Sequence, residues 1–366
     1  MIKLLRRLSL LSVLFTITAA QAQTKIENLI VITTDGLRWQ EVFNGMDTAL
    51  AKNKRFNQGD SSYIFKTFYD VDMNQRREKL FPFIWGTLAK QGQLYGNRQW
   101  GNKVDNANPY RISYPGYSEL LTGYVDSTIS SNSHPANPNV SVFEFINRQP
   151  KFKNKVAAFG AWNAFDRILN EERAGFPVIS AFDNSGGKNP GESQKLINQM
   201  LADSHKPWHN AECLDVFTHY AAFEQLKLKQ PKVLYIAYGE TDEWAHAGQY
   251  RSYLDAAHQV DAWLSDLWEY VQTHPKYKNK TALLLTVDHG RGDKNIYQWT
   301  EHGSTVQGAS ETWFGVLAPG IQAKGEMKQD MQLYQKQLAQ TIASLLGLTY
   351  KAEHPVAGKV EAIWEK

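Results

Sequence analysis

The sequence predicts an α/β protein with a mainly parallel central sheet. Strand-like and helix-like segments alternate along most of its 366 residues, an order typical of repeated βαβ units. The predicted strands are continuous runs of apolar and β-branched residues, which indicates burial on both faces, as in parallel sheets. These runs are residues 28–34, 155–162, 232–238, 281–287 and 313–319, and a shorter strand is predicted at 95–100.

The predicted helices lie between these strands. The longest, residues 249–273, has apolar residues at near-helical spacing, which indicates an amphipathic helix on the sheet. The other predicted helices are residues 81–89, 140–148, 211–228 and 331–346. Residues 126–139 are rich in Ser, Asn and Pro and are predicted to form a loop. We expect a single catalytic domain over residues 23–366, with residues 170–210 as the candidate insertion.

The N-terminus has the pattern of a signal peptide. Lys3, Arg6 and Arg7 precede an apolar run that is too short to span a bilayer, and the run ends near Ala20-Gln21-Ala22. Residues 1–22 are therefore predicted to be removed on export to the periplasm or the outside, leaving no transmembrane segment. An uncleaved N-terminal anchor helix is the alternative.

Charge and cysteine content exclude several classes of function. The net charge of +3 equals the three basic residues of the signal peptide, so the mature chain is near neutral and has no nucleic-acid footprint. Cys213 is the only cysteine, which excludes an internal disulfide and a multi-thiolate zinc site. Any metal must be held by histidine and carboxylate.

Ser113 is the predicted nucleophile. It precedes a Pro115-Gly116 turn signal and a helix-like run that ends at Gly123. This order places its hydroxyl at a helix N-terminus, where backbone N–H groups and the helix dipole favour an anion. The alternative for a serine in this position is a helix cap.

Aspartates and histidines follow the predicted strands. Because ligands bind at the carboxyl ends of strands in open α/β sheets, these side chains are expected to meet at one edge. Carboxylate and imidazole without thiolate suit Zn²⁺, and suit Mn²⁺ or Mg²⁺ less well. The candidate metal-binding residues are Asp35, Ser113, Asp242, His246, Asp288, His289 and His302. His134 lies in a loop shortly after Ser113 and could line the same pocket.

The order of these motifs resembles the alkaline phosphatase superfamily, and is most similar to its type I phosphodiesterase / nucleotide pyrophosphatase branch. The resemblance runs from residue 28 to about residue 320 and implies a three-layer α/β/α fold. The matching motifs are Asp35-Gly36, Ser113-Tyr114-Pro115 with Thr122-Gly123, Asp242-x-x-x-His246 with Gly248, Thr286 to Gly290, and His302-Gly303.

The resemblance implies two divalent metal ions, usually Zn²⁺. Asp242, His246 and His302 would bind one ion. Asp35, Asp288 and His289 would bind the other, with Ser113 Oγ beside it. Two adjacent cations suit in-line displacement at phosphorus. The implied activity is hydrolysis of a small-molecule phosphate ester through a phosphoserine.

The chain departs from the family pattern around its nucleophile. Gly116-Tyr117 replaces the Asn and His often found there, and Tyr117 takes the place of the Arg that formylglycine sulfatases carry, which argues against that branch. The Lys-x-Arg pair of some monoesterases is absent after residues 155–162, which favours a diester or an unusual substrate. Asn163 is a candidate donor to a phosphoryl oxygen. Aromatic candidates for the pocket walls are Trp39, Tyr114, Tyr117, Trp162 and Trp244.

Two alternatives stay open from the sequence. One is a phosphomonoesterase or phosphoryl transferase of the same superfamily. The other, from a different class, is a non-catalytic periplasmic protein that keeps a metal site for structure. The sequence predicts neither the natural substrate nor the oligomeric state.

Overall fold

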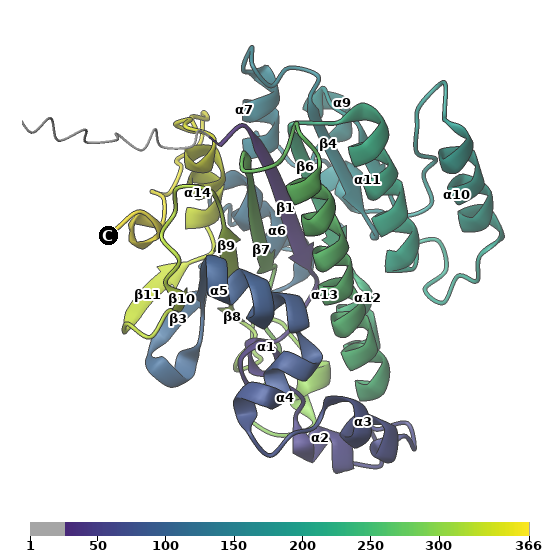
Figure 1. Cartoon of the computed structure of the whole chain (residues 1–366), viewed down its shortest axis with the longest axis vertical. Helices are drawn as coiled ribbons and strands as arrows, with labels where there is room; N and C mark the ends of the chain where they lie inside the picture. Colours follow the sequence, from purple (N-terminus) through teal and green to yellow (C-terminus); the bar gives the residue numbers. More distant parts are fainter. Residues whose placement is uncertain (1–25, 366) are drawn as a thin grey trace, which may run out of the picture.

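The computed structural model describes residues 26–365, so the predicted signal peptide lies outside the described residues. The centre of the fold is an eight-stranded sheet in the order β10-β2-β9-β7-β1-β6-β4-β5 (Figure 1). Its strands are β1 (Asn28–Thr34), β2 (Gln93–Tyr95), β4 (Val156–Gly160), β5 (Val178–Ser180), β6 (Val233–Tyr238), β7 (Thr281–Val287), β9 (Phe314–Leu317) and β10 (Gly325–Glu326). A second sheet, in the order β11-β3-β8, contains β3 (Asn102–Asp105), β8 (Glu311–Thr312) and β11 (Met331–Tyr334).

The middle of the large sheet is parallel, as predicted. β1 pairs in parallel with both β6 and β7, and β4 pairs in parallel with β5 and β6. Thr34, the last residue of β1, is in register with Tyr238 and Val287, the last residues of its two neighbours. The three strands therefore end at the same level. β9 is the strand that runs antiparallel to its neighbours: it pairs in this way with both β7 and β2.

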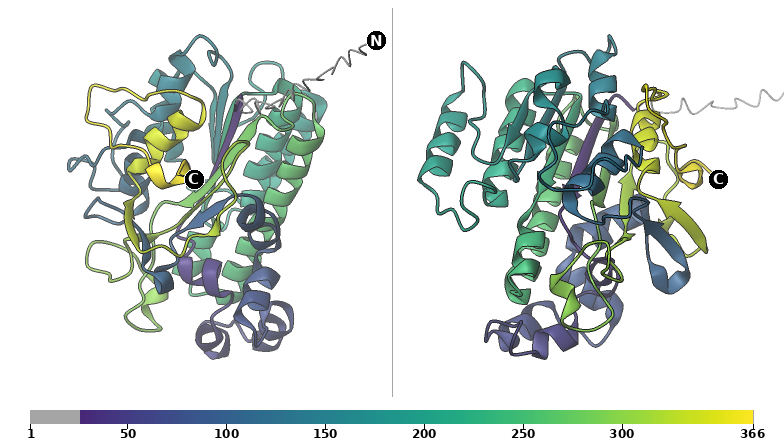
Figure 2. Two further views of the ribbon diagram at one scale, coloured as in Figure 1. Left: turned by 60° about the vertical axis from the view of Figure 1, so that its left-hand side comes forward. Right: turned by 180° about the vertical axis from the view of Figure 1, so that it is seen from behind.

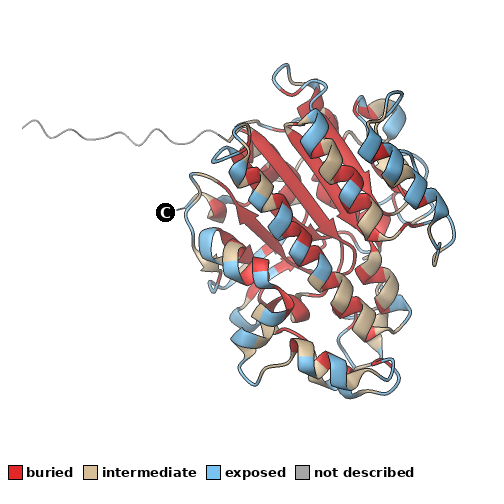
Figure 3. Ribbon diagram, turned by 45° about the vertical axis from the view of Figure 1, so that its right-hand side comes forward, coloured by how far each residue is buried: buried red, intermediate tan, exposed pale blue. Residues whose placement is uncertain are grey.

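Helices cover both faces of the sheet, which gives the predicted three layers (Figures 1 and 2). Even-numbered residues of β1, such as Ile30 and Ile32, pack with α13 and α11, whereas Leu29 and Val31 pack with α6, α7 and α14. Figure 3 shows that the sheet is buried while the outer helix surfaces are exposed. The helices are α1 (Trp39–Asn44), α2 (Thr48–Lys52), α3 (Ser61–Phe68), α4 (Met73–Leu80), α5 (Ala89–Gln91), α6 (Ser113–Thr122), α7 (Val142–Arg148), α8 (Phe165–Ile168), α9 (Glu171–Ala174), α10 (Glu192–Asp203), α11 (Asp215–Lys229), α12 (Glu240–His246), α13 (Tyr250–Thr273) and α14 (Gln337–Leu345).

Two predicted elements were wrong in part. The strand predicted at 95–100 ends at Tyr95, because Gly96 has a positive φ of 111° and Asn97 caps a 3₁₀ turn by accepting the Gln99 N–H. The helix predicted at 331–346 begins only at Gln337. Residues 331–334 form β11 instead, since Leu333 is buried between exposed neighbours, a period of two.

The candidate insertion, residues 170–210, is part of the layered fold at its edge. It contains α9, the edge strand β5 and α10. The cysteine that follows it, Cys213, is buried and unpaired, with its thiol 3.4 Å from the Thr218 hydroxyl.

No helix within residues 26–365 is both long enough and apolar enough to cross a lipid bilayer.

Candidate active site

The aligned ends of β1, β6 and β7 bring the first group of predicted ligands together. Asp35 follows β1, and Asp288-His289 follows β7. His289 Nε2 lies 3.2 Å from Asp35 Oδ1 and 3.4 Å from Asp288 Oδ2. The Gly36 N–H donates to Asp288 Oδ1 at 3.1 Å, which fixes this carboxylate across the two strand ends. Asp35, Asp288 and His289 thus form one compact donor group in which each side chain is buried.

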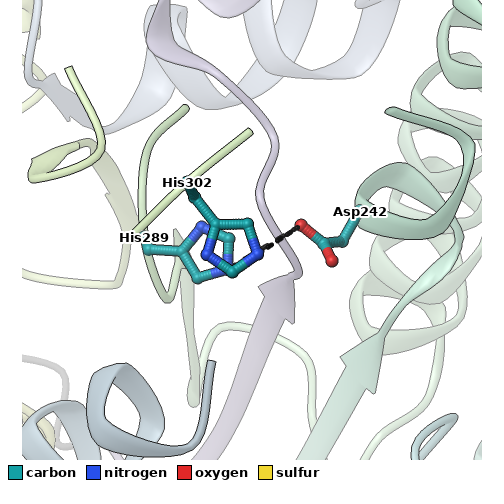
Figure 4. Close-up of side chains that lie close together, drawn as sticks. All are labelled: Asp242, His289 and His302. Carbon is teal, nitrogen blue, oxygen red and sulfur yellow. Dashed lines mark ion pairs between the residues drawn. The ribbon is translucent and has the colours of Figure 1, made fainter. Parts of the chain in front are cut away.

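A second donor group adjoins the first. Asp242 and His246 lie one turn apart on α12, and His246 Nε2 is 3.1 Å from Asp242 Oδ2 and 2.9 Å from His302 Nε2. His302 Nε2 is 3.8 Å from Asp242 Oδ1, as is His289 Nε2. Figure 4 shows the rings of His289 and His302 stacked beside Asp242. The centroids of the two rings are 3.9 Å apart. The structure therefore brings all six predicted Asp and His ligands together, and His289 lies between the two groups.

Ser113 lies at the mouth of this cluster as the first residue of α6. Its Oγ is 3.5 Å from Asp35 Oδ1 and 3.3 Å from His289 Nε2. The N-cap position belongs to Ile112, which makes no side-chain cap bond. The hydroxyl of Ser113 therefore faces the Asp and His side chains rather than capping its helix.

Gly116 allows α6 to approach β7 this closely. A Cβ at this position would lie 2.6 Å from the Asp288 carbonyl oxygen, which is closer than atoms in a packed interior tolerate. The departure from the family pattern at residue 116 therefore has a local reason: any side chain would push the start of α6, and with it Ser113, away from Asp288.

The electrostatics of the site favour a bound cation. Burial, together with the neighbouring charge of Asp242, raises the pKa of Asp35 well above its ordinary value, and burial and Asp35 do the same to Asp288. Burial lowers the pKa of His289 to about 4 and also lowers that of His302, so both rings are neutral and can donate a lone pair.

The residues present fit a divalent cation. Asp288 Oδ2 is buried without a hydrogen-bond partner, which is costly unless something else neutralises it. Two groups have donor atoms close enough to hold one ion each: Asp35 with Asp288 and His289, and Asp242 with His289 and His302. The second group contains His289 in the place where the resemblance implied His246. His246 lies next to this group, in contact with His302. Oxygen and imidazole donors in this arrangement suit Zn²⁺.

Metal binding is expected to stabilise the protein, and more so at higher pH. Because Asp35 and Asp288 have raised pKa values, an incoming cation displaces protons, and its affinity rises with pH. Zn²⁺ at about 1,000 times its Kd would add about 4 kcal/mol. Calorimetric melting should therefore show a larger Zn²⁺-induced rise in Tm at about pH 8 than at about pH 5.5. Asp288→Asn should lose most of this rise, and the exposed Asp293→Asn should keep it. An equal rise at both pH values would contradict this description of the site.

Arg291 is a site residue that the sequence analysis missed. Its guanidinium is buried and pairs with Asp242 Oδ1 through Nη1. It also donates from Nε to the Trp299 carbonyl at 2.7 Å and from Nη2 to the Thr300 carbonyl at 2.6 Å. Burial alone would raise the pKa of Asp242, but Arg291, and after it His246, lower it well below the ordinary value. A basic residue three positions after Asp288, at a strand end, was the available signal.

The predicted substrate-binding residues lie in different settings. Tyr117 is fully buried and donates to Asp35 Oδ2 at 3.1 Å, so it orients this carboxylate. Tyr114 is also buried, and its hydroxyl donates to the carbonyls of Pro135 and Arg167. Asn163 is exposed beyond the end of β4, where its amide donates to the Asn210 carbonyl. His134 packs on the Tyr114 ring at 5.5 Å between centroids.

The fold is of the alkaline phosphatase type, with a mainly parallel eight-stranded sheet between layers of helices. A family model described as Sulfatase matches residues 115–348, more than half of the chain. The chain therefore belongs to the sulfatase family, within the alkaline phosphatase superfamily, and is a hydrolase of that family. This confirms the superfamily and the fold predicted from the sequence, whereas the matching family is the sulfatase family and not the predicted type I phosphodiesterase / nucleotide pyrophosphatase branch.

Solved structures resemble this fold at low sequence identity. A 2-O GAG sulfatase, BT1596, is 13% identical and superimposes with a TM-score of 0.57 over 93% of this chain and 74% of that one. The phosphonate monoester hydrolase of Agrobacterium radiobacter is 12% identical, with a TM-score of 0.56 over 92% and 77%. The lipoteichoic acid synthase LtaP from Listeria monocytogenes is 13% identical, with a TM-score of 0.52 over 89% and 73%. A comparison with curated proteins gives no match.

Proposed function

We propose that this protein is an exported, metal-dependent phosphodiesterase that acts through Ser113. The observation that carries the proposal is the placement of Ser113 Oγ within 3.5 Å of Asp35 Oδ1 and 3.3 Å of His289 Nε2, beside two groups of metal-type donors. A hydroxyl in such a setting is typical of an activated nucleophile. Export rests on the signal-peptide pattern of residues 1–22.

The side chains of the site divide the chemistry between them. Asp35 and His289 hold the Ser113 hydroxyl, and the first turn of α6 favours the negative charge of the phosphoryl group. A divalent cation, when bound, supplies Lewis acidity that lowers the pKa of a nearby hydroxyl and neutralises phosphoryl oxygens. Ser113 Oγ loses its proton and forms a bond to phosphorus as the bond to the leaving oxygen breaks, and the first alcohol departs with a proton. The intermediate is a phosphodiester between Ser113 and the retained alcohol. Water then cleaves its bond to Ser113, which releases the phosphomonoester and restores the hydroxyl.

Two arginines near the site, Arg291 and Arg167, are already paired, which favours a diester over a monoester, whereas the Nε of Arg111 has no hydrogen-bond partner. Arg291 is bound to Asp242 and two carbonyls. Arg167 donates to the carbonyls of Asn132 and His134 and lies over the Tyr114 ring. A dianionic monoester would need a further cation to bind it, whereas a diester has a single negative charge.

Sulfate ester hydrolysis is the second candidate, and membership of the sulfatase family favours it. A sulfate ester also has a single negative charge, so the charge argument does not separate the two substrates. The residue four positions after Ser113 separates the two candidates. Tyr117 occupies the position of the Arg that formylglycine sulfatases carry, and its hydroxyl is used to orient Asp35.

A panel of aryl esters tests the proposal. We expect the Zn²⁺-loaded protein to hydrolyse bis(4-nitrophenyl) phosphate with a kcat/KM at least about tenfold above those for 4-nitrophenyl phosphate and 4-nitrophenyl sulfate. Preference for the sulfate would assign the protein to the second candidate. Preference for the monoester would favour a phosphomonoesterase or transferase, and no turnover of any ester would favour the non-catalytic metal-binding alternative.

Gly116→Ala is expected to lower diester turnover by about 10²-fold, because a displacement of the nucleophile by about 1 Å has an effect of this size. The new Cβ would lie 2.6 Å from the Asp288 carbonyl oxygen, which is main chain and cannot rotate away. Steady-state kinetics with bis(4-nitrophenyl) phosphate measures the loss. Gly358→Ala, where no atom lies within 4 Å of the new Cβ, is the matched control. Equal turnover in the two variants would refute this role of Gly116.

A further inference from the structure

Glu119 is a buried carboxylate on α6, the helix that begins with Ser113. It is only 1% exposed. Its Oε1 accepts the main-chain N–H groups of Ala107 at 2.8 Å and Lys336 at 3.1 Å. Its Oε2 accepts the main-chain N–H and the side-chain amide of Asn108, both at 2.8 Å. A buried carboxylate needs such donors, and here they tie α6 to the segment that precedes Ser113.

Asn108 extends this anchor along the segment toward the nucleophile. The residue is buried, and its Oδ1 accepts the main-chain N–H groups of Tyr110 at 3.1 Å and Arg111 at 2.9 Å. Its amide nitrogen is bound by Glu119, so both ends of the side chain are in use. Residues 106–112 form neither a helix nor a strand. The path of the chain into α6 is therefore fixed by these side-chain hydrogen bonds rather than by a regular backbone ladder.

Arg111 has a left-handed backbone conformation, with a φ of 53°. This region is unfavourable for a residue with a Cβ, and a residue stays in it only where the surrounding contacts determine it. The contact in this case is the acceptance of the Arg111 N–H by Asn108. Because Arg111 lies two residues before Ser113, the unusual conformation also sets where α6 begins.

The Arg111 carbonyl contacts the metal-type ligand His302. The distance from His302 Nδ1 to the carbonyl oxygen is 3.1 Å. Since a carbonyl oxygen only accepts, Nδ1 donates, and Nε2 is left with the lone pair that a metal ion requires. His302 lies in an irregular segment, whereas Asp35 and Asp288 directly follow strands. The bond to Arg111 therefore fixes the ring orientation and the tautomer of a ligand that no helix or strand holds.

We propose that Glu119 and Asn108 are positioning residues that hold Arg111 in its left-handed conformation. This one conformation then orients His302 for a metal ion and places Ser113 at the mouth of the Asp and His cluster. Both residues act through the main chain of Arg111 and not on the reacting atoms. The link to Ser113 rests on the proposed phosphodiesterase function, whereas the link to His302 can be tested without turnover.

Zinc affinity tests the link to His302. Titration with Zn²⁺ against a competing chelator should show that Asn108→Ala weakens one of the bound ions by about tenfold or more, the usual effect of losing an outer partner of a ligand. Asn147→Ala is the matched control. Asn147 is also buried, and its Oδ1 accepts the N–H of Asn154, another left-handed residue, but it lies on α7. Unaltered affinity in Asn108→Ala, or equal losses in the two variants, would overturn the proposal.

A glycine at residue 111 separates this role from a general loss of structure. Glycine adopts a positive φ without the Cβ penalty. Adding Arg111→Gly to Asn108→Ala should therefore restore most of the lost zinc affinity, and Arg111→Gly alone shows the effect of losing the guanidinium. No recovery in the double variant would mean that Asn108 does not act through the conformation of Arg111, and would overturn the proposal.

The tautomer of His302 can be measured in the unaltered protein, which keeps the proposal testable if Asn108→Ala does not fold. Nitrogen-15 NMR of the metal-free protein, with the His302 signals assigned by comparison with His302→Gln, should place the proton on Nδ1. A proton on Nε2 would overturn the link between Arg111 and His302.

Turnover at saturating Zn²⁺ tests the link to Ser113. We expect kcat for bis(4-nitrophenyl) phosphate to fall by about tenfold or more in Asn108→Ala and to stay near the unaltered value in Asn147→Ala. A full kcat in Asn108→Ala would overturn the link to Ser113. If the unaltered protein hydrolyses no ester, the phosphodiesterase function fails and the link to Ser113 with it, whereas zinc affinity and the tautomer still decide the link to His302.

Discussion

Ser113→Ala is expected to lower kcat for bis(4-nitrophenyl) phosphate by about 10⁴-fold or more, the scale seen when a nucleophile is removed. The side chain lost is the one whose Oγ lies 3.5 Å from Asp35 Oδ1 and 3.3 Å from His289 Nε2. The Asp and His donors are unchanged by this substitution, so zinc content should stay at the unaltered level. Acid-quenched samples of the unaltered protein should contain Ser113 esterified by a 4-nitrophenyl phosphoryl group, detectable by mass spectrometry, and the variant should contain no such adduct.

Ser118→Ala is the matched control on the same helix. Ser118 is also buried on α6, but its Oγ accepts from the Asn137 amide at 3.0 Å and takes no part in the Asp and His cluster. We expect it to cost about 1 kcal/mol of stability through the lost hydrogen bond and to leave kcat near the unaltered value. Unchanged turnover in Ser113→Ala at full zinc content would show that another group, or water itself, attacks phosphorus.

The centre of the fold was predictable because the sequence of each buried central strand is a continuous apolar run. Residues 28–34 and 281–287 became β1 and β7 without a change of boundary. Segments that are stabilised by pairing across long sequence distances were not predictable. β11 is a strand because it pairs with β3, more than 200 residues earlier in the chain, and local pattern does not report such a partner.

The predicted site came together for a related reason. Asp35 and Asp288 each follow a parallel strand directly, so the register of the sheet places them side by side. The sequence could not reveal what the surrounding loops contribute. Arg291 depends on a turn whose path the local sequence does not determine, and it is an ordinary charged residue when read alone. The orientation of Tyr117 toward Asp35 likewise follows from helix packing.

Arg291→Met is expected to destabilise the metal-free protein by about 3–5 kcal/mol, the usual effect of breaking a buried ion pair. The substitution leaves Asp242 without its guanidinium partner and the carbonyls of Trp299 and Thr300 without donors. Arg291→Lys should recover only part of the loss, because a single ammonium cannot reproduce the three-way contact of the guanidinium. Urea unfolding measures both variants. Lys294→Met, an exposed residue of the same loop, should change the free energy of unfolding by no more than about 0.5 kcal/mol.

The same variant tests whether Arg291 and a metal ion share Asp242. The guanidinium and a cation held by Asp242, His289 and His302 would both neutralise this carboxylate. Removing Arg291 should therefore strengthen the electrostatic attraction for Zn²⁺, and the loss of stability should be smaller with Zn²⁺ than without it. The difference between the two losses is the coupling energy of the two positive charges through Asp242. Equal losses in both states would mean that Asp242 serves only Arg291, and that the metal-type donors of the site are confined to Asp35, Asp288 and His289.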